Sequence, residues 1–140
     1  MPKLSCVLLV DDDQTTNYLN QLLLKRLNVT DKLVVALNGA EALQQLQIHG
    51  QDASEDQPIL VLLDVKMPVM NGFEFLEAYD QLPLLQKQAI IIVMLTTSLH
   101  PQDVGRLEKL PIAGLLNKPL TKEKVDDIMR IHFNAQLPNS

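Results

Sequence analysis

Residues 5–13 read SCVLLVDDD, an uninterrupted apolar run that ends abruptly in three acidic residues. A strand that is covered by helices on both faces requires an apolar stretch of this kind, without alternation. Four similar runs follow, at residues 32–37, 59–63, 89–95 and, more weakly, 114–116. The opening stretch therefore predicts the first strand of a buried parallel sheet.

Amphipathic patterns separate these runs. Apolar residues recur at spacings of three and four from five starting points: Tyr18, Ala40, Phe73, Val104 and Val125. This spacing is typical of helices with one buried face, and Asn38 and Thr121 are placed to cap the second and the fifth. Strands that alternate with helices predict an α/β fold, a (βα)5 doubly wound five-stranded parallel sheet. Such a sheet binds ligands beyond the carboxyl ends of its strands.

Composition limits the class of protein. The chain has 140 residues, 46% of them hydrophobic, which suits one globular domain; we expect it at residues 1–135, with residues 136–140 as a C-terminal tail. The net charge of -5 argues against non-specific nucleic-acid binding. No apolar stretch is long enough for a membrane span, and the single cysteine, Cys6, is expected to be a buried free thiol. These features predict a cytoplasmic protein.

Polar side chains follow the predicted strands. Asp11 and Asp12 follow the first, Asp64 the third, Thr96 the fourth and Lys118 the fifth. Because parallel strands end at one edge of the sheet, we expect these groups to share a crevice. Clustered carboxylates repel one another, so a hard divalent cation such as Mg²⁺ is the natural partner, and a lysine suits a phosphate oxygen. A carboxylate can also be a nucleophile that forms an aspartyl-phosphate, so the pattern predicts phosphoryl transfer onto Asp64.

Four segments carry a family resemblance: VDDD (10–13), LLDVKMPVMNG (62–72), VMLTTS (93–98) and NKPLT (117–121). They resemble, in order, the signature segments of the response-regulator receiver domains of two-component signal transduction. The resemblance extends over residues 4–133 and implies the flavodoxin-like receiver fold.

The resemblance also implies roles for individual residues. Asp64 is expected to accept a phosphoryl group from the phosphohistidine of a sensor histidine kinase or a histidine phosphotransfer protein. Mg²⁺ is expected to bind Asp12 directly, Asp11 through water, Asp64, and the backbone carbonyl of Lys66. Since Asp13 follows, the acidic pair could lie one position later, but the apolar run ends at Val10, which favours Asp11 and Asp12.

The remaining pocket residues are also assigned by resemblance. Thr96 and Lys118 are expected to hold the phosphoryl group, and Pro119 to fix the turn that follows Lys118. Met67, Pro68 and Gly72 are expected to shape the rim of the pocket.

The family resemblance further implies a phosphorylation-dependent switch. It is expected to signal through contacts with a downstream protein or by passing the phosphoryl group onward. It is expected to catalyse only its own phosphorylation and dephosphorylation, without binding nucleic acid or membrane. We expect a monomer or a weak phosphorylation-dependent dimer, with no output domain after the fifth helix.

Three positions depart from the family pattern or modify it. Leu115 stands where most receivers have an aromatic residue, three positions before the lysine, so the usual coupling between threonine and aromatic ring is in question. Lys66 and Ser98, two residues after Asp64 and Thr96, could meet attacking water and so alter the lifetime of the phosphoryl group.

Two other functions remain open at this point. Residues 11–15, DDDQT, fit the D-x-D-x-T pattern of haloacid-dehalogenase phosphatases, although Asp64 would then have no role and no acidic pair follows a later strand. The chain could also be a receiver-like binding module that is not phosphorylated. The intact set of acidic, threonine and lysine residues argues against that alternative.

Overall fold

The computed structural model describes residues 4–83, 87–97, 101–107 and 109–133, without the side chains of residues 52, 101, 102 and 104. Its five strands form one parallel sheet in the order β2-β1-β3-β4-β5. The strands are β1 (Cys6–Val10), β2 (Leu33–Ala36), β3 (Ile59–Asp64), β4 (Ile90–Thr96) and β5 (Gly114–Asn117). Each lies within one residue of its predicted range at both ends.

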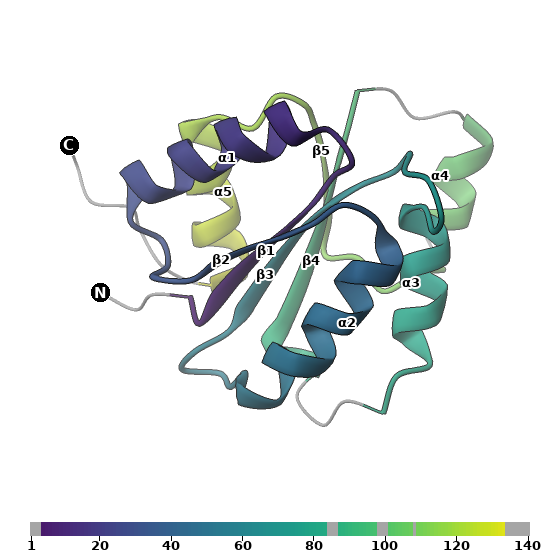
Figure 1. The fold of residues 1–140 in the computed structure, drawn as a ribbon, viewed down its shortest axis with the longest axis horizontal. Helices are drawn as coiled ribbons and strands as arrows, with labels where there is room; N and C mark the ends of the chain where they lie inside the picture. The colour runs from purple at the N-terminus through teal and green to yellow at the C-terminus, as the bar shows by residue number, and fades with distance from the viewer. Residues whose placement is uncertain (1–3, 84–86, 98–100, 108, 134–140) are drawn as a thin grey trace.

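Five α-helices connect or follow the strands. They are α1 (Gln14–Leu27), α2 (Gly39–His49), α3 (Gly72–Asp80), α4 (Pro101–Leu107) and α5 (Lys122–Phe133), with short 3-10 helices at Gly50–Asp52 and Lys87–Ala89. Figure 1 shows α1 and α5 on one face of the sheet and α2, α3 and α4 on the other. The predicted doubly wound fold is therefore confirmed. No helix among the described residues has the length and apolar character needed to cross a membrane.

The central strands contribute to two separate cores. In β1, Val7 and Leu9 pack with the residues of α1 and α5, whereas Leu8 and Val10 pack with those of α2 and α3. All five residues of β1 are buried, which explains why this run shows no alternation. Cys6 belongs to the same strand and is a buried free thiol, as predicted, and burial raises its pKa to about 11.

The fifth strand is less covered. It lies at the edge of the sheet, pairs with β4 alone, and alternates between half-buried and exposed residues. Its Leu115 side chain is 41% exposed. This position at the edge accounts for the weak apolar signal of residues 114–116.

Side-chain caps fix where the helices begin. Asn38 accepts a hydrogen bond from the Glu41 N–H, and Thr121 accepts one from the Lys124 N–H, so both predicted caps are confirmed. A complete capping box joins Asn71 and Glu74 at the start of α3. That box fixes the point at which the loop after β3 turns into a helix.

Two sequence predictions lie outside the described residues: the tail at residues 136–140 and the role of Ser98.

Candidate functional site

The sheet brings the polar side chains together as expected. Val10 of β1 pairs with Leu63 of β3, so Asp11 and Asp64 leave the sheet side by side. On the other side of β3, Asp64 pairs with Leu95, directly before Thr96. The carboxyl ends of three neighbouring strands thus meet at one place.

An acidic cluster occupies this place. Carboxylate oxygens of Asp11, Asp12 and Asp64 all lie within 4.8 Å of one another. Asp11 is buried, Asp64 is partly buried and Asp12 is exposed. The cluster is therefore open to solvent on the side of Asp12 and closed beneath Asp11.

The third carboxylate of the DDD run has a different task. Asp13 is the N-cap of α1; it accepts hydrogen bonds from the Thr15 N–H at 3.0 Å and the Thr16 hydroxyl at 2.9 Å. The hydrogen bond from Thr16, followed by that from Thr15, lowers the pKa of Asp13. The geometry thus groups Asp11 and Asp12 with Asp64 and assigns Asp13 to the helix.

Lys118 supplies a positive charge to the cluster. Its Nζ lies 2.6 Å from Asp11 Oδ2 and 3.2 Å from Asp64 Oδ1. Asp11 and Lys118 are 107 positions apart in the sequence, and they meet because β5 places the lysine at the same edge of the sheet. The Lys118 N–H donates to the Thr96 carbonyl at 2.8 Å, and the Lys118–Pro119 peptide bond is cis.

The pKa values of the pocket reflect an excess of negative charge. Burial, followed by the negative charge of Asp11, raises the pKa of Asp64 above its ordinary value despite the nearby ammonium. Burial opposes the charged form of Lys118, but the hydrogen bond to Asp11 and the charge of Asp64 outweigh it and raise the lysine pKa. One ammonium therefore leaves the three carboxylates incompletely neutralised.

The donor set fits a divalent cation. Mg²⁺ binds oxygen at about 2.0–2.1 Å in an octahedron, so ligand oxygens on one ion lie up to about 4.2 Å apart. The carboxylate oxygens already lie within 4.8 Å of one another, so small side-chain rotations suffice to bring them onto one ion. The exposed side of the cluster leaves room for the waters that Mg²⁺ retains.

Asn17 is a site residue that sequence analysis missed. Its Nδ2 donates to the Asp11 carbonyl at 2.8 Å, and the side chain is 3% exposed. The Asp11 N–H donates to the Ala36 carbonyl at 3.1 Å, so both backbone groups of Asp11 are held. Its signal in the sequence is a polar residue seven positions before Leu24, on the buried face of α1.

The loop after β3 passes close to the phospho-acceptor candidate. A Cβ at Gly72 would lie 2.4 Å from the Asp64 carbonyl oxygen, so this position admits no side chain without a shift of the backbone. The predicted rim residues differ in burial: Met67 and Gly72 are buried, whereas Pro68 is exposed. Lys66, whose carbonyl is the predicted metal ligand, is also exposed. Val69 at the loop's outer edge has φ 68° and an 82% exposed side chain.

Thr96 and Leu115 lie at different depths. Thr96 ends β4 and is 4% exposed. Leu115 pairs with Met94, two residues before Thr96, and is 41% exposed.

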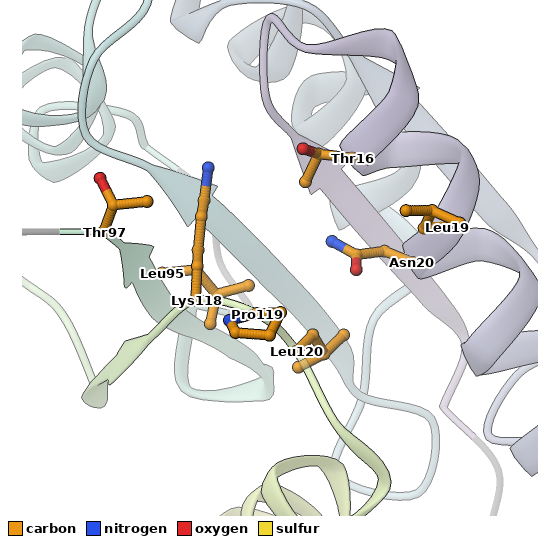
Figure 2. Close-up of a pocket in the computed structure, with 8 residues that line it drawn as sticks. All are labelled: Thr16, Leu19, Asn20, Leu95, Thr97, Lys118, Pro119 and Leu120. Carbon is orange, nitrogen blue, oxygen red and sulfur yellow. The ribbon is translucent and has the colours of Figure 1, made fainter.

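A hollow of about 430 Å³ lies beside Lys118. Figure 2 shows Lys118 extending past it, with Thr16, Leu19 and Asn20 of α1 on one side and Leu95 and Thr97 on the other. Pro119 and Leu120 line its floor, so the approach to the lysine from this side is mainly apolar.

Fold and site together define a class: a doubly wound parallel α/β domain whose strand ends hold an acidic pocket with one lysine. The chain belongs to the response-regulator receiver domain family, whose family model matches residues 7–130. Receiver domains are phosphorylation-dependent signalling modules of two-component systems. They typically bind Mg²⁺ at an acidic pocket, and they interact with histidine kinases and phosphotransfer proteins.

Individual relatives agree with this assignment. The response regulator Rcp1 of Synechocystis sp. is 35% identical over 112 residues, which cover 80% of this chain and 75% of the relative. The autoinducer 1 sensor kinase/phosphatase LuxN of Vibrio harveyi is 30% identical over 96% of this chain but only 14% of its own length. A two-component response regulator from Cytophaga hutchinsonii superposes with a TM-score of 0.78 at 26% identity, covering 95% of this chain and 99% of the other. The family match and the capping role of Asp13 argue against the haloacid-dehalogenase alternative.

Proposed function

We propose that this chain is a phosphorylation switch in which Asp64 accepts a phosphoryl group from a protein phosphohistidine. The donor is a sensor histidine kinase or a histidine phosphotransfer protein. The observation that carries the proposal is the Lys118 ammonium, which lies within 3.2 Å of carboxylate oxygens of both Asp11 and Asp64. This arrangement combines a nucleophile with a cation suited to phosphate oxygens.

The transfer requires one bond to form and one to break. A carboxylate oxygen of Asp64 attacks phosphorus, the phosphorus–nitrogen bond breaks, and its electron pair stays on the donor imidazole. Lys118 is close enough to Asp64 to pair with a phosphoryl oxygen attached there. Thr96, at the end of the neighbouring strand, donates its hydroxyl hydrogen bond to the same group.

The metal ligands we propose are Asp11, Asp12, Asp64 and the backbone carbonyl of Lys66. These residues would hold Mg²⁺, and the ion would supply positive charge that neutralises the phosphoryl oxygens. The fit of the carboxylate spacing and the excess negative charge of the pocket support this assignment.

We further propose that the phosphorylated domain acts on another protein, through direct contact or by onward phosphotransfer. LuxN, a sensor kinase, contains a stretch similar to nearly this whole chain, which is consistent with a position in a phosphorelay. Because Leu115 lacks an aromatic ring and is exposed, we propose that the change at Thr96 reaches the surface without an inward-turning ring. The domain remains a monomer or dimerises weakly when phosphorylated.

A direct test is incubation with phosphoramidate or acetyl phosphate and Mg²⁺, followed by intact-mass measurement. We expect an added phosphoryl mass on the parent, none on Asp64→Asn, and none when Mg²⁺ is removed with a chelator. Asp13→Asn is the matched control: it removes a neighbouring carboxylate but keeps a good helix cap, so its adduct should form normally.

Absence of an adduct with every donor, in a folded protein, would contradict the proposal and favour a binding module that is not phosphorylated. An adduct that persists in Asp64→Asn would place the acceptor elsewhere.

A further inference from the structure

A second lysine holds the segment that carries Lys118. Lys124 lies in the first turn of α5, and its Nζ donates to the Asn117 carbonyl at 2.5 Å and to the Pro119 carbonyl at 2.8 Å. These two carbonyls belong to the residues on either side of Lys118. One ammonium therefore bridges the backbone across the pocket lysine.

The segment needs such support because the sheet holds it from one side only. β5 is an edge strand, and its last contact with the sheet near the pocket is the bond from the Lys118 N–H to the Thr96 carbonyl at 2.8 Å. On the helical side, Thr121 caps α5 by accepting from the Lys124 N–H at 3.2 Å. The Lys124 side chain connects the start of α5 to the backbone on either side of Lys118.

The location of this lysine in the helix is itself informative. A positive charge in the first turn of a helix is disfavoured by the helix dipole. In Lys124 this cost is offset by hydrogen bonds from a charged donor, which are stronger than neutral ones. Both accepting carbonyls lie outside the helix, in the strand end and in the turn.

We propose that Lys124 is a positioning residue: it fixes the backbone on both sides of Lys118 and thereby holds the Lys118 ammonium against Asp64. The inference rests on the proposed function, since Lys118 matters most when Asp64 is phosphorylated. None of the described contacts joins Lys124 to the carboxylate of Asp11 or Asp64, so its effect passes through Lys118.

The first measurement is the rate of phosphorylation by phosphoramidate at saturating Mg²⁺. We expect Lys124→Met to reduce the maximal rate about tenfold, less than the ~100-fold that a 1 Å misplacement can cost. Lys124→Arg should recover most of the rate, because a guanidinium can also donate to both carbonyls. Lys122→Met, which removes the same charge from the same turn, is the matched control and should change the rate less than twofold.

A double-mutant cycle then separates action through Lys118 from a separate effect. In the Lys118→Met background, adding Lys124→Met should cause no further loss of rate. Independent, multiplying losses would overturn the proposal, as would an equal loss in Lys122→Met or no loss in Lys124→Met.

Hydrogen exchange tests the positioning even if phosphorylation fails. The Lys118 amide, bonded to Thr96, should exchange about tenfold faster in Lys124→Met, while the amide of Leu8 in the central strand should be unchanged. If the parent forms no Asp64 adduct but this amide responds, the proposed function is wrong and the positioning is supported. If the adduct forms and neither the amide nor the rate responds, only the positioning is wrong.

Discussion

The backbone of Val69 is in a conformation that is strained for a valine. Its φ of 68° lies in the left-handed region, and among the described non-glycine residues only Asn28, with φ 55°, shares this property. Asparagine tolerates the conformation, whereas a β-branched residue there is an outlier. We expect Val69→Asn to stabilise the protein.

The size of the effect follows from strain and exposure. The left-handed conformation costs an ordinary residue about 1–2 kcal/mol. Because the Val69 side chain is 82% exposed, its removal sacrifices almost no burial. We expect Val69→Asn to raise the free energy of unfolding by about 1 kcal/mol, or Tm by roughly 3–4 °C for a chain of this length. Val69→Gly should gain less, because glycine also makes the unfolded chain more flexible.

Urea denaturation and calorimetry without Mg²⁺ measure these differences directly. Val69→Thr is the control, because it removes apolar character and keeps the β-branch, and it should leave the stability unchanged. The reciprocal change, Asn28→Val, should cost about 1 kcal/mol by placing a β-branched residue in the left-handed cap of α1. An asparagine variant no more stable than the parent, or a threonine variant that gains equally, would refute the reasoning.

Three further results are expected. Gly72→Ala should lower the free energy of unfolding by about 1–3 kcal/mol in urea titrations, because its Cβ meets the Asp64 carbonyl at 2.4 Å. Burial and the charge of Asp11 raise the pKa of Asp64. The stability that the Asp64 carboxyl contributes is therefore complete below about pH 4 and is lost as the pH rises through its raised pKa. Without Mg²⁺, Asp64→Asn should therefore melt above the parent at pH 7, with a difference that shrinks toward pH 4; a constant difference would contradict this. Mg²⁺ should raise the Tm of the parent, and a chelator should reverse this increase, whereas the Tm of Asp12→Ala should change little. Equal Tm shifts in both proteins would exclude Asp12 as a ligand.

The fold was predictable because its strands are buried on both faces. The run that ends at Val10 has no alternation, and the structure shows two cores sharing that strand. The grouping of Asp11, Asp64 and Lys118 was predictable for a related reason, since parallel strands end at one edge. The metal-binding and phosphoryl roles of these residues remain predictions.

The supporting contacts were less accessible to sequence analysis. Asn17 is recognisable in the sequence as a polar residue on a buried helix face. Its hydrogen bond to the Asp11 carbonyl, however, depends on how α1 is oriented after β1. Lys124 left no such signal, because a lysine on a terminal helix is usually a solvated surface residue. Gly72 fitted a motif, although its contact with the Asp64 backbone became visible only in three dimensions.

The 107 positions between Asp11 and Lys118 also have a consequence for how the protein is made. During synthesis β1 and β3 emerge well before β5. The carboxylates of Asp11 and Asp64 therefore lack the positive charge of Lys118 until β5 has been made. The pocket cannot close until the final strand has docked at the edge of the sheet, because closing so long a loop comes late in assembly. If Asp64 is the phospho-acceptor that we propose, a chain whose β5 has not yet docked lacks the Lys118 ammonium beside Asp64, and we expect it to be a poor acceptor.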